Sequence, residues 1–240
     1  MSRRLLAEAL GTAWLLIAVV GSGIMAERLS QGNSALALLA NAVATGTALV
    51  VLIVVMGPIS GAHFNPCVTL YQVLQRQMAW RDAGSYVLTQ IAAAILGVWL
   101  ANAMYGLPVL EVSSHLREGP TQWLAEAIAT FGLLMSIAGG TRFAPAAVPA
   151  LVGLYITGAY WFTASTSFAN PAVTVARMLS DSFAGIAPAS APGFVVAQLV
   201  ATGVAASVLP WLFATPAKGS PDNTTAAGMR DMPENTARSA

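Results

Sequence analysis

Two copies of one short motif decide the fold of this chain: His63-Phe64-Asn65-Pro66-Cys67-Val68-Thr69 and Phe168-Ala169-Asn170-Pro171-Ala172-Val173-Thr174. Asn at an N-cap satisfies free N–H groups of the first turn, and Pro at the first helical position loses no hydrogen bond. Each motif therefore predicts a helix that begins at its Pro. The stretches before them, Ser60-Gly61-Ala62 and Ser165-Thr166-Ser167, interrupt apolar sequence with small and polar residues. Non-helical backbone at membrane depth has to line a wet cavity or lie buried in protein.

The surrounding sequence is that of an integral membrane protein. The 240 residues are 56% hydrophobic and 9% charged, with a mean hydropathy of +0.68, which excludes an ordinary soluble domain. No charged residue occurs between Arg28 and Arg76, so the first motif does not lie in a surface loop. Apolar runs near the roughly 20 residues that a membrane-spanning helix needs predict six spans, at about 5–26, 35–57, 83–105, 122–140, 146–163 and 193–214.

A second repeat indicates that the chain has two related halves, about 1–106 and 120–215. Ala7-Glu8-Ala9 opens the first half, and Ala125-Glu126-Ala127 opens the second. Three spans in each half place the halves in the membrane in opposite directions, as inverted repeats. The two Asn-Pro segments then enter from opposite faces, and their positive helix ends meet near the midplane. We therefore expect an all-α membrane protein with six transmembrane helices and two re-entrant half-helices in one channel domain, 1–215.

The distribution of basic residues predicts the orientation. Basic side chains near the ends of spans stay in the cytoplasm, and an inside N-terminus places most of them there. The inside group is then Arg3, Arg4, Arg76, Arg81, Arg142, Lys218, Arg230 and Arg238, against Arg28, Arg117 and Arg177 outside. We expect a multi-pass protein of the cell (inner) membrane with both termini cytoplasmic. Residues 216–240 are polar and are expected to form a mobile cytoplasmic tail, with partner binding as the alternative.

Several functional classes find no support in the sequence. There is no Ser/His/Asp set and no phosphate-binding glycine loop, so no enzyme and no cofactor are expected. The net charge of +1 and the absence of a basic cluster give no sign of nucleic-acid binding. The single Cys67 excludes an intramolecular disulfide and an all-Cys metal site. The expected partners are membrane lipid and small neutral solutes.

The two motif asparagines are the main candidates for solute contact. If each side-chain oxygen caps its helix, the NH₂ of Asn65 and of Asn170 has to point into the cavity and offer two donors. Carbonyl groups of the segments before them, Gly61, Ala62 and His63, would supply acceptors along the wall. This arrangement favours neutral polar molecules, because the paired positive helix ends oppose cations. Alternatively, both Asn-Pro pairs are ordinary helix caps within a bundle.

Glu8 and Glu126 are carboxyls inside predicted spans, where such groups mark function. They could accept N–H groups from the two re-entrant loops or relay protons, and the acceptor role is favoured because neither half has a second acidic or Lys partner within its spans. His63 could carry a proton, or act only through its backbone carbonyl. The carbonyl role is favoured because Phe168 occupies the matching position in the second half.

With these motifs in place, the chain resembles the aquaporin, or major intrinsic protein, family over nearly all of residues 5–214. The resemblance implies a right-handed six-helix bundle, a pore in each monomer, a homotetramer and passive conduction without a cofactor. Water-selective relatives place an Arg directly after the second motif, together with an aromatic and a His, at the narrowest point. Counting along these relatives puts Val173 in place of the Arg, Thr45 in place of the aromatic and Gly158 in place of the His. Ser167 falls on a loop position of the same constriction, so a wide, uncharged constriction is expected.

Such a filter predicts permeation by solutes larger than water, such as glycerol, urea or arsenous acid, and resembles that of bacterial arsenic-resistance-associated, aquaglyceroporin-like channels. The alternatives are a plain water channel, a junction or scaffold protein on the same fold, and a proton-coupled transporter.

Arg177 could present a charge to the outer vestibule and attract anions, or could extend to lipid headgroups. Cys67 could bind trivalent arsenic or mercury, or simply replace Ala as a small apolar side chain.

Overall fold

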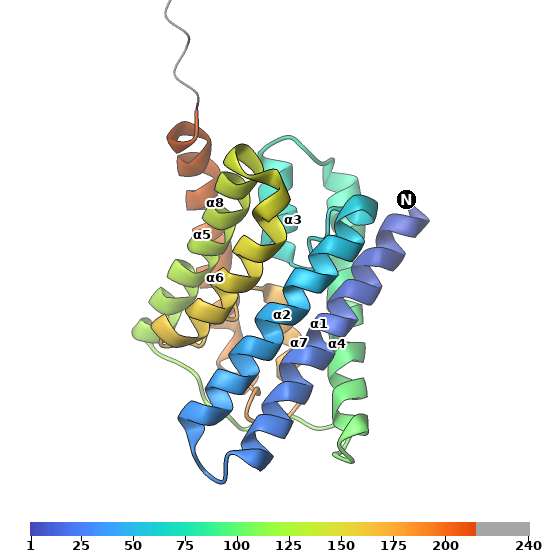
Figure 1. The fold of residues 1–240 in the computed structure, drawn as a ribbon, viewed down its shortest axis with the longest axis vertical. Coiled ribbons are helices and arrows are strands. Elements are labelled where there is room, and N and C mark those ends of the chain that lie inside the picture. The colour runs from blue at the N-terminus through green and yellow to red at the C-terminus, as the bar shows by residue number, and fades with distance from the viewer. Residues whose placement is uncertain (215–240) are drawn as a thin grey trace, which may run out of the picture.

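The computed structural model describes residues 1–214, which form a bundle of helices (Figure 1). Six helices are long and apolar enough to cross a membrane, and they confirm the six predicted spans. They are α1 (Ser2–Leu29), α2 (Ser34–Ser60), α4 (Trp80–Met104), α5 (Pro120–Phe143), α6 (Val148–Phe162), which a short 3₁₀ turn (Pro145–Ala147) precedes, and α8 (Ala191–Leu212). The tail expected at 216–240 lies outside the described residues.

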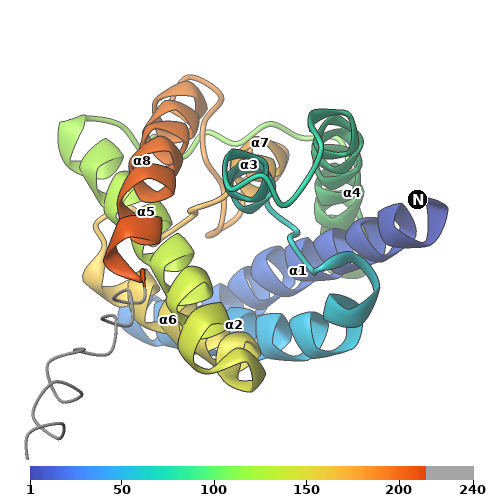
Figure 2. The same ribbon diagram turned by 90° about the horizontal axis from the view of Figure 1, so that it is seen from above.

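Two short helices begin at the prolines of the repeated motif, as the sequence predicts. α3 comprises Pro66–Leu74 and α7 comprises Pro171–Arg177. Asn65 Oδ1 accepts the N–H of Cys67 at 2.8 Å, and Asn170 Oδ1 accepts the N–H of Ala172 at 3.0 Å. Seen from above, α3 and α7 lie between α4 and α8, on the side of the bundle away from α2 and α6 (Figure 2). The chain therefore contains the two expected half-helices.

The packing of the helices repeats between the two halves. α1 packs against α2 and α4, and α5 packs in the same way against α6 and α8. The half-helices connect the halves, because α3 contacts α8 and α7 contacts α4. Each half-helix therefore lies partly against the other half of the chain, and the region where their N-termini meet is built by both halves.

A pair of glycines allows α2 and α6 to approach closely. A Cβ atom added to Gly46 would lie 2.6 Å from the carbonyl oxygen of Gly153, and one added to Gly153 would lie 2.5 Å from the carbonyl oxygen of Gly46. Small residues at such contacts let the backbones of membrane helices pack directly. This contact brings the pore-facing side chains of α2 and α6 together on one wall.

Candidate functional site

A cavity in the middle of the bundle brings together most of the residues that the sequence singled out. Its volume is about 170 Å³. Both motif asparagines lie on its wall, and so do their lead-in segments and several filter candidates. The predicted residues that line it are Thr45, Gly61, Ala62, His63, Asn65, Ser167, Asn170, Val173 and Arg177.

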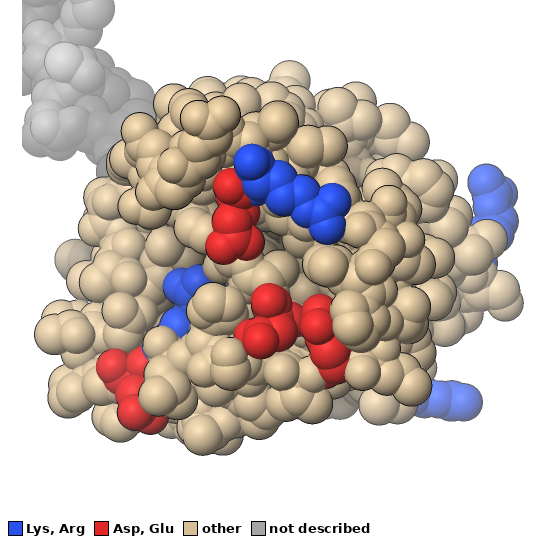
Figure 3. All heavy atoms as spheres, turned by 90° about the horizontal axis from the view of Figure 1, so that it is seen from below, with Lys and Arg blue, Asp and Glu red and all other residues tan. Residues whose placement is uncertain are grey.

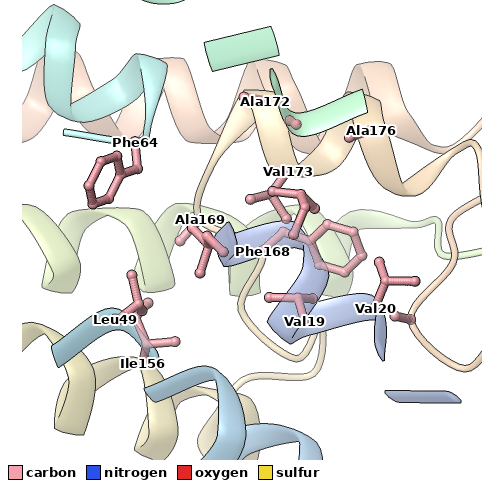
Figure 4. Packing of buried hydrophobic residues seen from close by; sticks show 14 of the residues in the cluster. Val19, Val20, Leu49, Phe64, Ile156, Phe168, Ala169, Ala172, Val173 and Ala176 are labelled. Atoms are coloured by element: carbon pink, nitrogen blue, oxygen red, sulfur yellow. The ribbon is translucent and has the colours of Figure 1, made fainter. Parts of the chain in front are cut away.

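Four long helices complete the wall with side chains at four-residue spacing, a repeat that keeps them on one face of a helix. α2 contributes Thr45, Leu49 and Ile53, and α6 contributes Val148, Val152, Ile156 and Tyr160. α5 adds Leu133, Ile137 and Thr141, and α1 adds Leu15 and Val19. Leu49 and Ile156 are shown close together in Figure 4, with Val19 beside Phe168. Extending the four-residue repeat from Thr45 would have predicted the α2 part of this wall.

The structure corrects the prediction that Gly158 lines the decisive stretch. Gly158 does not lie on the cavity wall, where Ile156 and Tyr160 of the same helix do. A Cβ atom at Gly158 would instead meet the ring of Phe162 at 3.7 Å. Two residues along a helix correspond to about 200° of rotation, so a residue midway between two pore-facing residues faces away from the pore. Counting along the water-selective relatives thus assigned the wrong residue of α6.

Tyr160 therefore puts an aromatic group where the sequence predicted none. Its hydroxyl lies 3.2 Å from Thr45 Oγ1, in hydrogen-bonding range, and both side chains are buried. Ser167 and Val173 lie on the same cavity wall, as expected. The expected set of Val, Thr, Gly and Ser is incomplete, because a tyrosine and an arginine also line the cavity.

The two asparagines hold each other's loops through their side-chain nitrogens. Asn65 Nδ2 donates to the carbonyl of Ala169 at 2.7 Å, and Asn170 Nδ2 donates to the carbonyl of Phe64 at 2.8 Å. The expectation that each NH₂ presents both donors to the cavity is therefore wrong. One N–H of each amide bonds across the midplane, which leaves one for a solute.

The segments before the asparagines have the same unusual backbone in both halves. The residues one and three positions before each Asn have positive φ: Ala62 and Phe64 at 49°, Ser167 at 52° and Ala169 at 49°. Non-glycine residues rarely adopt this region and do so at a cost of about 1–3 kcal/mol each. The surrounding structure has to supply interactions that hold these loops.

The two buried glutamates supply those interactions. Glu8 accepts the backbone N–H of His63 at 3.0 Å and that of Phe64 at 2.8 Å. Glu126 accepts the N–H of Phe168 and that of Ala169, both at 2.8 Å. Both carboxylates are fully buried. The hydrogen bonds match the acceptor role favoured from the sequence.

Two glutamines that sequence reasoning missed orient these carboxylates. Gln90 Nε2 donates to Glu8 at 2.8 Å and to Thr69 Oγ1 at 3.1 Å. In the second half, Gln198 Nε2 donates to Glu126 at 2.6 Å and to Thr174 Oγ1 at 3.0 Å. Each threonine hydroxyl donates in turn to the carbonyl of its motif asparagine. The feature of the sequence that could have identified these residues is one polar Gln in each half, at matching places in α4 and α8.

Comparisons with known proteins show the family to which this chain belongs. A family model described as Major intrinsic protein matches residues 1–157. The chain belongs to the major intrinsic protein family. It is 54% identical over 212 residues to "Aquaglyceroporin AqpS" of Rhizobium meliloti (strain 1021), covering 88% of this chain and 91% of that protein. It is 32% identical over 139 residues to "Aquaporin NIP1-1" of Zea mays, covering 57% of this chain and 48% of that protein.

A solved structure has the same fold as this major intrinsic protein. The X-ray structure of the aquaglyceroporin from Plasmodium falciparum superimposes with a TM-score of 0.71 and covers 88% of this chain and 98% of that one. The sequence identity is 20%. Together with the two half-helices, this likeness confirms the aquaporin-like fold class.

In this major intrinsic protein, His63 uses its backbone and its side chain. Its N–H bonds to Glu8, its Nδ1 lies 3.1 Å from Thr69 Oγ1, and its ring centroid lies 5.2 Å from that of Tyr86.

Cys67 is fully buried and is not among the residues lining the cavity. Within residues 1–214, no group of three or more His, Cys, Asp or Glu side chains could hold a metal ion.

Arg177 lies neither at the lipid headgroups nor on an open vestibule surface. Its exposed fraction is 2%, and it lines the cavity. Its guanidinium carbon is 3.5 Å from the centroid of the Phe168 ring, and its Nε donates to the carbonyl of Ala184. The alternative in which Arg177 extends to the headgroups is therefore wrong, and the wall of the cavity carries a positive group.

Proposed function

We propose that this chain is a passive channel for small uncharged solutes, namely polyols such as glycerol, metalloid hydroxides such as arsenous acid, and water. The observation that carries the proposal is the cavity between the two Asn-capped half-helices, with one free amide N–H of Asn65 and one of Asn170 at its wall. The 54% identical relative named an aquaglyceroporin supports it.

The wall suits molecules that carry several hydroxyls on a small apolar frame. Amide donors and the hydroxyls of Thr45 and Tyr160 are placed beside aliphatic stripes from α1, α2, α5 and α6. A polyol can exchange hydrogen bonds with the polar groups while its carbon side faces the stripes. Arsenous acid is neutral near pH 7 and presents hydroxyls in a similar way.

The test is uptake into proteoliposomes measured by stopped-flow light scattering. Glycerol, urea, arsenite and water are compared in vesicles with the protein and in empty vesicles. Glycerol and arsenite fluxes above those of empty vesicles support the proposal. Water flux alone would indicate the plain water channel, and no flux of any solute would favour a junction or scaffold protein. Uptake that follows an imposed pH gradient would indicate proton coupling.

We further propose that both termini face the cytoplasm of the cell (inner) membrane. The N-terminus and the end of α8 lie at the same end of the bundle (Figure 1). The opposite face carries acidic as well as basic side chains (Figure 3). The excess of basic residues at the first end supports this orientation. Labelling of single cysteines placed near Arg3 and near Glu118 from either side of intact cells tests it.

The family resemblance also supports a homotetramer with one pore in each copy. Large apolar side chains are exposed on the outside of the bundle, including Leu88 and Leu154, and they can face lipid or a second copy. Native mass spectrometry of the detergent-solubilised protein distinguishes a tetramer from a monomer.

A further inference from the structure

Arg177 is a charged group at the pore wall with most of its hydrogen-bonding capacity unused. A guanidinium has five N–H donors, and within residues 1–214 the only hydrogen bond of this one is from Nε to Ala184. No carboxylate in the described part of the chain lies within 4.0 Å of it. Because Arg177 lines the cavity, its two terminal nitrogens can meet a molecule that enters there.

A second arginine lies near the same aromatic ring. The guanidinium carbon of Arg117 is 5.4 Å from the centroid of Phe168. Its Nε donates to the carbonyl of Gly185 at 2.8 Å, and its Nη2 donates to that of Phe183 at 3.1 Å. Among residues 1–214 it forms no ion pair either. The loop 183–185 thus fixes two positive groups around Phe168 without a carboxylate to neutralise them.

We propose that Arg177 forms a subsite on the cavity wall that binds small, singly charged oxyanions through its two terminal nitrogens, with Arg117 adding to the positive field. The planar guanidinium fork matches two oxygens of a carboxylate, sulfonate or arsenate group. Its position is fixed before the ligand arrives, by the Phe168 ring and by the carbonyl of Ala184. Such a subsite goes beyond the proposed conduction of uncharged solutes.

The site differs from a surface arginine in its surroundings. Arg28 at the end of α1 has a similar pair of contacts, with its guanidinium carbon 5.2 Å from the Tyr105 ring centroid and its Nη2 3.1 Å from the Tyr105 carbonyl. Arg28 is exposed and is not part of the cavity wall. Since interactions of a charge strengthen when water is excluded, Arg177 should bind an anion that Arg28 does not retain. Arg28 is therefore the matched control.

Methanesulfonate is the probe, because it stays anionic at every usable pH and its methyl protons give one NMR signal. Saturation-transfer NMR on the full-length protein in nanodiscs measures its binding beside that of dimethyl sulfone, an uncharged analogue of similar shape. Wild-type protein should bind methanesulfonate at least about tenfold more tightly, the effect expected from a charge-assisted hydrogen bond. Arg177→Met should remove this preference, and Arg28→Met should preserve it.

Equal binding of the two probes by the wild type, or a preference that persists in Arg177→Met, would overturn the proposal. If Arg177→Met does not give a monodisperse protein, Arg177→Lys decides, because it retains the charge and loses the fork. It should weaken methanesulfonate binding by at least about threefold, and unchanged binding would refute the assignment. The NMR measurement needs no solute flux, so its failure is separate from a failure of the proposed channel function.

Discussion

The side chain of Asn65 donates a hydrogen bond of 2.7 Å to the carbonyl oxygen of Ala169, in the other half of the chain. Asn170 makes the reciprocal bond to the carbonyl of Phe64 at 2.8 Å. Each asparagine thus caps its own half-helix with its oxygen and holds the opposite loop with its nitrogen. The two halves fix each other where a solute passes, which explains why an amide serves here better than another N-capping residue.

Replacing Asn65 with Asp should test this crossed arrangement. Asp caps a helix as well as Asn does, but its second oxygen would face the carbonyl of Ala169 without a donor. We expect the free energy of unfolding to fall by about 1–3 kcal/mol and glycerol flux to fall with it. Asn33→Asp is the matched control, because Asn33 caps α2 through its oxygen and its nitrogen makes no hydrogen bond in residues 1–214. Equal effects of the two variants on thermal unfolding in detergent would contradict the crossed role.

Glu126→Gln should disturb the second loop more than its small change in size suggests. Glu126 accepts the backbone N–H groups of Phe168 and Ala169 with different oxygens, and an amide can accept only one of them. The other N–H would face an NH₂ group, at a cost of about 1–3 kcal/mol for an unsatisfied donor. Thermal unfolding and glycerol flux should both decline, whereas Glu118→Gln on the exposed surface should change neither. A stable, conducting Glu126→Gln protein would remove the acceptor role.

Tyr160 should determine which solutes pass, and Gly158 should not. Tyr160→Ala removes an aromatic ring from the cavity wall, so flux of a longer polyol such as xylitol should rise relative to that of glycerol. Gly158→Ala places its methyl group next to Phe162 and should leave this ratio unchanged. Stopped-flow swelling with the two polyols measures it. The opposite result, with Gly158→Ala changing the ratio and Tyr160→Ala leaving it constant, would restore Gly158 as the selective position of α6.

Val173→Arg should suppress larger solutes first. Val173 lines the cavity one helical turn before Arg177, so a long cationic side chain there narrows the pore and adds a like charge at i,i+4. Glycerol and arsenite flux should decline more than water flux. Val173→Met adds length without charge and separates the two causes in the same flux assay. If all solutes decline in parallel, general misfolding or blockage, rather than selection by size, would account for the effect.

The loop contact between Ser114 and Asp181 should depend on pH. The backbone N–H of Ser114, at 2.8 Å, and its hydroxyl hold the pKa of Asp181 below its usual value. Because the pKa is lower in the folded state, the stabilisation is complete above the unfolded-state pKa and is lost as pH falls through the lowered value. The protection of residues 113–116 from hydrogen exchange, relative to the intrinsic rate at each pH, should therefore fall only in strong acid. Asp181→Asn should show faster exchange already at neutral pH, and Glu118→Gln should not.

Much of the architecture was predictable because it depends on local rules. Asn followed by Pro specifies a helix start in each half, and the apolar runs specify the spans, since unpaired backbone groups cannot remain in lipid. The repeated Glu8 and Glu126 indicated acceptors for the two loops, and the hydrogen bonds of the structure agree. The residues with these roles all belong to motifs that occur twice, so each half of the sequence could be compared with the other half.

The α6 part of the pore wall could not be predicted in the same way. Gly158 was assigned by counting along water-selective relatives, but the rotation of α6 about its axis decides which residue faces the cavity, and Tyr160 faces it. That rotation is set by packing across α2 and α6, where Gly46 and Gly153 let the two backbones meet. Gln90 and Gln198 were missed for a similar reason, because their role depends on carboxylates distant in the sequence.

The sequence by itself thus determined a membrane-embedded pair of inverted halves with two helix N-termini facing one another, because capping, hydropathy and repetition are properties of short segments. Only the tertiary structure decided that one donor of each asparagine bonds across the midplane, that Tyr160 lines the wall and that Arg177 is buried against Phe168. These features depend on distances between segments that are far apart in the chain. Packing of whole helices fixes those distances, and no local sequence pattern predicts them.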